Sequence, residues 1–155
     1  MIIREATIND LPAIQDLGLG LFRDPSGSTE KYADFDWAHD ERGKSYYLEH
    51  IENADKLCLV AETEGMVVAY LTGEPNTLVD WRPIKTFELG SFFVLPKYRS
   101  KGIGTDMVKK FTKWAKDNGA VTVRVSAYAA NKRGIEFYKN IGFEPESLTL
   151  EMELK

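Results

Sequence analysis

"PKYRSKGIGTDMVKK", residues Pro96–Lys110, joins an apolar strand pattern to an amphipathic helix pattern through a positively charged turn. Arg99 and Lys101 lie in this turn, and Gly102 and Gly104 open the helix. A helix N-terminus presents backbone N–H groups without partners inside the helix, and it carries a partial positive charge. Glycine lacks the Cβ that would keep a ligand away from the backbone. The stretch therefore predicts a site for a phosphate or pyrophosphate group.

Three glycine-rich patterns can form such a site, and the chain matches one of them. A Walker A loop needs G-x-x-x-x-G-K-[ST], which does not occur in the sequence. A dinucleotide fingerprint needs a third glycine where Met107 stands, and an acidic residue after the next strand pattern, where none occurs. The third pattern, R/Q-x-x-G-x-G/A, fits residues 99–104. A basic turn with a glycine cap and no ligand is the alternative.

The composition of the chain argues against several classes of protein. Its 155 residues are 43% hydrophobic, enough for the core of a single domain spanning residues 1–155. A net charge of −4 argues against nucleic acid as the main partner. No apolar run approaches the length of a membrane span, and the charged N-terminus lacks a signal-peptide pattern. With Cys58 alone and His39 and His50 the two histidines, we expect no disulfide, no metal site and a cytoplasmic location.

Hydrophobic periodicity predicts a mixed α/β fold. Strand patterns cover residues 1–6, 56–62, 66–73, 85–95, 120–127 and 147–154. Helical patterns begin after Asn9 or Asp10 and then span about residues 39–54, 103–118 and 131–141. The short turn at Glu64–Gly65 predicts a hairpin, and Gly90 within an apolar strand predicts a bulge. The strand–helix–strand order of residues 85–127 predicts a right-handed crossover.

Three segments resemble the GNAT superfamily of N-acetyltransferases, in the order typical of that family. They are IREATINDLPAIQDL (residues 3–17), FELGSFFVLPKYRSKGIG (87–104) and NKRGIEFYKNIGFE (131–144). In that family the R/Q-x-x-G-x-G/A pattern is the loop that holds the pyrophosphate of acyl-CoA. The resemblance covers essentially the whole chain and is weakest over residues 23–55. It implies a mostly antiparallel sheet splayed at its central strands and flanked by about four helices. It also implies acetyl-CoA as cosubstrate and a primary amine, on a small molecule or a peptide, as acceptor.

The resemblance implies that Glu88 is the general base, because several family members keep a catalytic glutamate at this place on the central strand. An alkylammonium has a pKa near ~10.4, so an acceptor amine must lose a proton before it can attack at neutral pH. Side chains alternate along a strand, which puts Glu88 on the face of Gly90 and Phe92 unless the strand is bulged. A salt bridge to Arg82 or Lys85 is the alternative role.

Further roles follow from the same resemblance. The backbone N–H of Phe92 or Phe93 would hold the thioester carbonyl, and Val94 would pair with the pantetheine arm. Asn131 and Tyr138 lie on one face of a predicted helix and span about 10 Å, so they could reach the pantetheine amides and the sulfur. Tyr138 would protonate the leaving thiolate, with core packing as its alternative. The loop residues assigned to the cofactor are Arg99, Ser100, Lys101, Gly102, Ile103, Gly104 and Thr105.

The acceptor site is the least determined part of the prediction. Between Asp24 and Glu41, six acidic residues stand against Lys31 as the single base, together with three aromatic residues. Acidic and aromatic side chains suit a cationic amine, and a solvated acidic loop is the alternative. Trp37 and Trp81 are candidates for the wall of the acceptor cleft or for the core. A non-catalytic acyl-CoA-binding homologue is the alternative function, and a homodimer is compatible with either.

Overall fold

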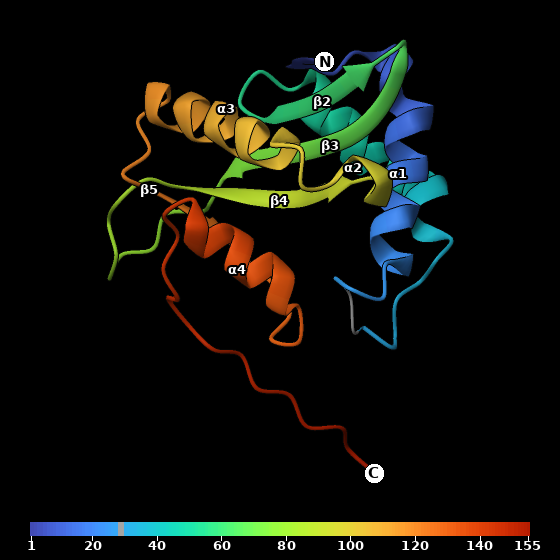
Figure 1. The fold of residues 1–155 in the computed structure, drawn as a ribbon. Coiled ribbons are helices and arrows are strands. Elements are labelled where there is room, and N and C mark those ends of the chain that lie inside the picture. The colour runs from blue at the N-terminus through green and yellow to red at the C-terminus, as the bar shows by residue number, and fades with distance from the viewer. Residues whose placement is uncertain (28–29) are drawn as a thin grey trace.

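A computed structural model of the chain describes residues 1–27 and 30–155. Over these residues, one five-stranded sheet has the order β1-β2-β3-β4-β5 (Figure 1). Its strands are β1 (Ile2–Glu5), β2 (Leu57–Thr63), β3 (Met66–Pro75), β4 (Thr86–Val94) and β5 (Thr122–Val125). The first four strands pair antiparallel, and β5 pairs parallel with β4. The mixed, mostly antiparallel sheet that the sequence predicts is therefore confirmed.

Helices cover both faces of this sheet (Figure 1). On one face lie α1 (Leu11–Arg23) and α2 (Glu41–Glu52), and on the other lie α3 (Ile103–Asp117) and α4 (Lys132–Asn140). Short 3₁₀ turns precede α1, α2 and α3, at Ile8–Asp10, Trp37–His39 and Pro96–Tyr98. Within the described ranges, no helix combines the length and the apolar character needed to cross a bilayer.

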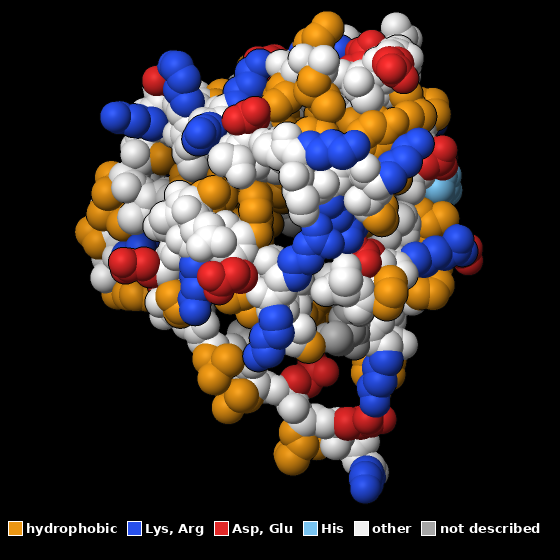
Figure 2. Space-filling view, viewed as in Figure 1, with side chains coloured by type: hydrophobic (Ala, Val, Ile, Leu, Met, Phe, Trp, Pro, Cys, Tyr) orange, Lys and Arg blue, Asp and Glu red, His pale blue; other side chains and the backbone are white. Residues whose placement is uncertain are grey.

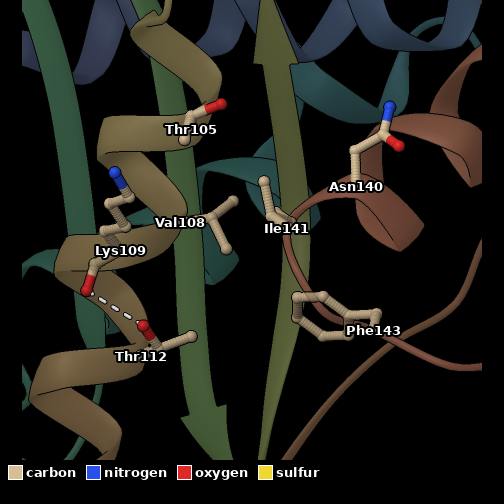
Figure 3. Close-up of a pocket in the computed structure, with 7 residues that line it drawn as sticks. All are labelled: Thr105, Val108, Lys109, Thr112, Asn140, Ile141 and Phe143. Carbon is tan, nitrogen blue, oxygen red and sulfur yellow. Dashed lines mark hydrogen bonds between the residues drawn. The ribbon is translucent and has the colours of Figure 1, made fainter.

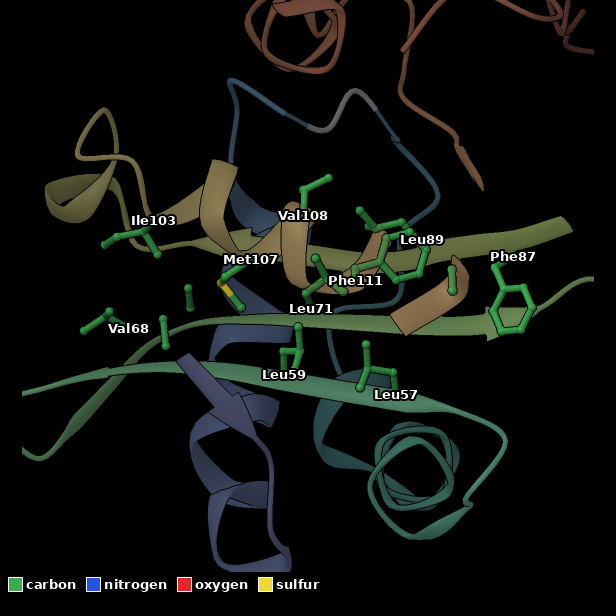
Figure 4. Close-up of a cluster of buried hydrophobic side chains, with 13 residues drawn as sticks. Leu57, Leu59, Val68, Leu71, Phe87, Leu89, Ile103, Met107, Val108 and Phe111 are labelled. Carbon is green, nitrogen blue, oxygen red and sulfur yellow. The ribbon is translucent and has the colours of Figure 1, made fainter. Parts of the chain in front are cut away.

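The apolar faces of these elements form two buried clusters, one on each side of the sheet. Figure 4 shows the larger cluster, in which Met107 and Phe111 of α3 lie among leucines of β2, β3 and β4. The second cluster joins Ile14 of α1 and Tyr47 of α2 to Val60 and other side chains of the opposite face. Full burial of such a side chain contributes about 1.5–3 kcal/mol. The two clusters therefore fix the helices that carry the candidate site.

One local prediction holds and one boundary shifts. Glu64 and Gly65, at the predicted hairpin turn between β2 and β3, both have positive φ, at 52° and 75°. Two successive residues with positive φ are the mark of a type I′ turn. α2 begins at Glu41 rather than at residue 39, because the Asp40 side chain accepts hydrogen bonds from the backbone N–H groups that open the helix.

A β-bulge at Gly90 divides β4 into two parts, as the glycine predicts. The register with β3 places Thr72 opposite both Gly90 and Ser91. The Ser91 backbone N–H donates to the Thr72 hydroxyl at 2.8 Å, which fixes the bulge. An inserted residue of this kind bends a strand and disrupts its pairing locally.

This bulge reverses the faces that the side chains of β4 occupy. Before it, Phe87 and Leu89 lie in the cluster on the α3 side. After it, Phe92 packs against that cluster and Phe93 lies in the cluster under α1 and α2. Glu88 therefore lies on the α1–α2 side, opposite to Phe92. The sequence placed the two on one face unless the strand is bulged. The bulge is present, and its one inserted residue inverts the alternation.

The strands β4 and β5 separate beyond the bulge. Their parallel register runs from Thr86 opposite Thr122 to Leu89 opposite Val125 and ends there. Residues 90–94 of β4 consequently have no strand partner on the β5 side within the described chain. The splay expected at the central strands is confirmed.

The strand predicted over residues 147–154 was wrong, since the structure assigns no strand after α4. The segment runs away from the sheet (Figure 1), and Glu153 within it forms an ion pair with Lys31. Its alternating apolar side chains are 75–85% exposed: Leu148, Leu150, Met152 and Leu154. Alternation gives a strand one apolar face, but it does not supply the partner strand on which a strand depends.

Candidate active site

The turn between β4 and α3 has the backbone of an anion-binding loop. Ser100 and Gly102 have positive φ, at 60° and 84°, and Gly102 is the N-cap of α3. The first intrahelical hydrogen bond runs from the Asp106 N–H to the Gly102 carbonyl, so the N–H groups of residues 103–105 have no acceptor within the helix. Left-handed residues of this kind create a concave row of N–H groups that suits an anion.

Arg99 is turned away from this row of N–H groups. Its Nε donates to the Val94 carbonyl at 2.8 Å, and its terminal nitrogens bond to Asp24 and Ser26 at the end of α1. Burial acts to raise the pKa of Asp24, but hydrogen bonds from Ser26 and Arg99 lower it overall. The guanidinium therefore ties the turn to α1, whereas the sequence placed it on the cofactor.

Other basic side chains surround the turn, and one of them is not predicted by the motif. Lys101 is exposed and lies over the Tyr98 ring, and Arg133 of α4 reaches the Ser100 hydroxyl at 3.4 Å. Figure 2 shows Lys and Arg side chains gathered near the centre of the face that carries this turn. The only sequence signal for Arg133 is its place in the first turn of the helix that follows Asn131.

The absence of a Cβ at Gly104 leaves space that aromatic side chains of the protein fill, and not space for a ligand. A Cβ at this position would lie 3.2 Å from the Phe137 ring and 3.4 Å from the Phe92 ring. At Gly102, by contrast, a Cβ would meet no atom within 4 Å. The two glycines thus serve different needs: close packing of α3 against α4, and a left-handed cap.

Glu88 is half-buried and makes no hydrogen bond or ion pair with any described residue. The alternative salt bridges are not formed, because Arg82 donates to the Thr86 hydroxyl and Lys85 donates to the Asn118 carbonyl. The exposed Gly90 lies one residue beyond Leu89, at the opening between β4 and β5. The carboxylate is therefore available on the α2 side of that opening.

The aromatic residue Tyr138 lies on the opposite side of the sheet from Glu88. It packs between Phe137 and Phe143, with ring-centroid distances of 5.1 Å and 5.5 Å. Burial raises the pKa of its phenol, so the phenol keeps its proton at neutral pH. Within the described residues its hydroxyl makes no hydrogen bond, which leaves it able to donate.

Asn131 is the N-cap of α4. Its Oδ1 accepts a hydrogen bond from the Gly134 N–H at 2.9 Å, which satisfies one of the free donors at the start of the helix. Its side-chain NH₂ group makes no hydrogen bond with the described residues and can still donate to a ligand. Asn131 therefore caps the helix that carries Tyr138.

The two candidate tryptophans have different surroundings. Trp37 is half-buried and contacts the rings of Phe22, Tyr46 and Tyr47 at 5.5–5.9 Å. Trp81, in the loop between β3 and β4, is 82% exposed and makes no ring contact with a described residue. The structure therefore does not bring Trp81 and Trp37 together in one packed wall.

A residue that the sequence did not single out, Tyr46 of α2, closes the site above the bulge. Its hydroxyl bonds to the Thr72 hydroxyl at 2.9 Å and would lie 2.8 Å from a Cβ at Gly90. Burial raises the pKa of Tyr46 to about 12. No motif marks this residue, because its place depends on how α2 packs on the sheet.

Three of the six acidic residues between Asp24 and Glu41 are ion-paired, with two arginines between them. Asp24 pairs with Arg99, and Asp34 and Asp40 pair with Arg42. The loop also contains Ser28 and Thr29, which lie outside the described residues. Charge alone therefore supports a cationic acceptor less strongly than the sequence does.

A separate pocket of about 360 Å³ lies between α3 and the end of α4 (Figure 3). Its lining includes Thr105, Lys109, Asn140 and Phe143. Thr105 is the one residue here that the sequence assigned to the cofactor. Glu88 and Tyr138 do not line this pocket, so it is distinct from the opening between β4 and β5.

Comparison with known proteins identifies the family. The model of the acetyltransferase (GNAT) family matches residues 18–143, which include the whole turn, strands β2–β5 and helices α2–α4. This chain belongs to the GNAT family. The resemblance expected from the sequence is confirmed.

Similar GNAT proteins include an uncharacterized N-acetyltransferase of Methanocaldococcus jannaschii, 33% identical over 89 residues. That match covers 57% of this chain and 39% of the archaeal protein, so the chain spans well under half of that relative. An uncharacterized N-acetyltransferase of Bacillus subtilis, YhfO, is 26% identical over 95% of this chain and 92% of its own length.

Solved GNAT structures share the fold along the whole chain. A variant of the BH1408 protein of Bacillus halodurans has a TM-score of 0.79 at 22% identity, with all of both chains covered. Aminoglycoside N-acetyltransferase AAC(6')-Iy, solved with CoA, has a TM-score of 0.78 at 15% identity, covering 99% of this chain and 94% of that one. At such identities the likeness establishes the fold alone.

Proposed function

We propose that this GNAT chain transfers an acetyl group from acetyl-CoA to a primary amine. The observation that carries the proposal is the opening between β4 and β5. It begins at the Gly90 bulge and leads along β4 into the glycine turn that starts α3. A structural neighbour of this chain is an acetyltransferase solved in complex with CoA, which supports the same cosubstrate here.

The proposed cofactor site has two parts. The free N–H groups at the start of α3, with Lys101 and Arg133, would hold the pyrophosphate. The unpaired edge of residues 92–94 would pair with the pantetheine arm in the manner of an added strand, and Asn131 would donate to its amides. Arg99 would shape the turn through its bond to the Val94 carbonyl.

The proposed chemistry uses both sides of the sheet. Glu88 takes a proton from the acceptor ammonium on the α2 side, and the neutral nitrogen attacks the thioester carbonyl. The backbone N–H of Phe92 or Phe93 stabilises the oxyanion. As the C–N bond forms and the C–S bond breaks, Tyr138 gives its proton to the thiolate on the α4 side. The nitrogen loses a second proton as the amide forms, and this proton restores the Tyr138 phenol through solvent. Separation of base and acid by the sheet keeps the two proton transfers apart.

The acceptor remains defined by class. Trp37 and Tyr46 contact each other on the α2 side of the sheet, where Glu88 also lies, and this combination of aromatic rings and a carboxylate suits a primary alkylammonium. Relatives of the chain are named thialysine N-epsilon-acetyltransferase, and structural neighbours are aminoglycoside N-acetyltransferases. We therefore place a small polyamino compound ahead of a peptide N-terminus. The exposed Trp81 would border this site.

An assay of free CoA thiol with a panel of amines tests this function. The panel holds thialysine, neamine, spermidine and a short peptide with a free N-terminus, each with acetyl-CoA. Release of thiol that depends on one of these amines supports the proposal. Binding of acetyl-CoA without turnover of any amine would instead support the non-catalytic acyl-CoA-binding function. The homodimer, the cytoplasmic location, and the absence of metal, nucleic-acid and membrane partners stay predictions.

A further inference from the structure

Charged residues form one row across the sheet, on the face covered by α2. The register places Glu74 of β3 directly opposite Glu88, and Glu88 directly beside Arg124 of β5. Lys56, just before β2, contacts Glu74 with an Nζ–Oε2 distance of 2.7 Å. Arg124 is also paired with Glu146, at 2.8 Å. Two neighbouring carboxylates thus occupy the centre of the row, where like charges repel.

The buried side chain of His50 faces this row from α2. Its Nδ1 lies 2.8 Å from the carbonyl oxygen of Tyr46, and a carbonyl can only accept, so Nδ1 carries the proton of the neutral ring. Its Nε2 then carries a lone pair and can only accept a hydrogen bond. This atom is buried, has no hydrogen-bond partner among the described residues, and lies 3.7 Å from Oε2 of Glu74. Two acceptors face each other with no proton between them.

We propose that Glu74 and His50 take up the proton that Glu88 removes from the acceptor amine. This inference rests on the base role proposed for Glu88. The proton passes from the ammonium to the Glu88 carboxylate, then to Glu74, and then to the lone pair on Nε2 of His50. Both carboxylates end ionised, and the imidazolium donates to Glu74. Lys56 is a positioning residue that holds the Glu74 carboxylate between the other two groups.

The energetic reason is the order of the proton affinities. A carboxylic acid has an ordinary pKa near ~4.3 and an imidazole near ~6.5, so the ordinary difference favours delivery to His50 by about 2 pKa units. Burial lowers the pKa of His50 and makes this advantage smaller. An amine of high pKa gives its proton to Glu88 alone only with difficulty. Transfer onward to His50 would raise the fraction of free amine by up to about 100-fold.

The surroundings of His50 keep its imidazole ring unprotonated at Nε2 at neutral pH. Burial lowers its pKa, while the Tyr46 carbonyl, Glu74 and Glu49 act to raise it and Lys56 acts to lower it. The imidazole is therefore neutral and able to accept. A cavity of about 160 Å³, lined in part by His50 and Lys56, lies beside the ring and offers water a route by which the proton can leave.

¹⁵N NMR of the two imidazoles tests the proton site without an acceptor. His39 is exposed and bonded to Asp16, so His39→Gln assigns the remaining signals to His50. We expect neutral His50 to be protonated at Nδ1, and Glu74→Gln to lower its pKa because an attracting charge is removed. A neutral ring protonated at Nε2, or a His50 pKa that does not change in Glu74→Gln, overturns the proposal.

The pH profile of kcat/KM tests the catalytic part, with thialysine, neamine or spermidine, whichever the panel shows to react. His50→Asn keeps a donor for the Tyr46 carbonyl and removes Nε2. We expect a loss of 10- to 100-fold near pH 7 and an acid limb that moves to lower pH, because the final proton acceptor is then a carboxylate, which is ordinarily a weaker base than an imidazole. Glu41→Gln is the matched control, since Glu41 is an exposed acidic residue of the same helix and is not among the charges that act on His50.

The outcomes separate this inference from the proposed function. An unmoved acid limb in a folded His50→Asn protein overturns the relay, even if the protein acetylates amines. A lack of transfer to every amine in the panel contradicts the proposed function and the relay with it. The NMR result would then still show whether Glu74 and His50 share a proton.

Discussion

Arg99, the first residue of the glycine-turn motif, is ion-paired with Asp24 at the end of α1, 75 positions earlier in the chain. Both side chains are largely buried, with 17% and 12% of their surfaces exposed. The same guanidinium holds the Val94 carbonyl where β4 ends. The pair therefore joins the first helix to the turn on which cofactor binding depends.

The Asp24–Arg99 pair should show strong coupling in a double-mutant cycle. Asp24→Asn and Arg99→Ala each leave a charged partner unpaired, and we expect each to destabilise the protein by about 1–3 kcal/mol. The double variant should lose clearly less than the sum, with a coupling of at least about 1 kcal/mol. Urea unfolding of the four proteins measures this. Additive losses would mean that the two side chains do not interact in solution.

Gly102 and Gly104 should respond differently to alanine. Gly104→Ala would push a Cβ against Phe137, whereas Gly102→Ala meets no atom but must hold a left-handed backbone. Each should cost about 1 kcal/mol. Replacing the Phe137 ring by the smaller leucine side chain, in Phe137→Leu, should restore part of the stability that Gly104→Ala loses. It should restore none of the stability that Gly102→Ala loses. Equal effects of Phe137→Leu on both variants would rule out the packing role of Gly104.

Asp10 should contribute to stability in a defined range of acid pH. Hydrogen bonds from Arg4 lower the pKa of Asp10 from 3.8 to about 2. The contribution of the ionised carboxylate is then complete above about pH 4, and it is lost as the pH falls through about 2. In Asp10→Asn we expect up to about 2 kcal/mol less stability at pH 7, with the difference from wild type closing toward pH 2. Glu62→Gln, which also removes a partner of Arg4, is the control.

Glu88→Gln and Tyr138→Phe should fail in different ways, because a base acts on the amine and an acid acts on the thiolate. Glu88→Gln should be most impaired at low pH and should recover as the pH approaches the pKa of the amine. Tyr138→Phe should lose on the order of 10²-fold in kcat/KM, and less for a thioester with a more acidic thiol. Because burial raises the pKa of Tyr138, its loss should not depend on pH near neutrality. Wild-type rates in either variant would remove that residue from the mechanism.

The sequence predicted well those features that depend on local pattern. The hairpin at Glu64–Gly65, the bulge at Gly90 and the cap at Gly102 each need a backbone conformation that few residues adopt, so they leave a clear signal. The parallel pairing of β4 with β5 followed from the order of elements, because a crossover through a helix makes strands parallel.

Features that depend on distant partners were less predictable. The face of Glu88 relative to Phe92 depended on whether a bulge forms at Gly90, and alternation alone could not decide that. The strand expected at residues 147–154 was missed because alternation does not show whether a partner strand exists. The partner of Arg99 and the approach of His50 to Glu74 arise only when α1 and α2 pack on the sheet, and no motif encodes them.

The thermal unfolding midpoint with and without acetyl-CoA tests the central claim most directly. The turn at the start of α3 should bind acetyl-CoA, and a ligand at 100 times its Kd stabilises the folded state by about 2.7 kcal/mol. We predict a rise of the midpoint with acetyl-CoA that depends on its concentration, and no rise with NAD or ATP. A midpoint unchanged by acetyl-CoA and raised by NAD would contradict the account.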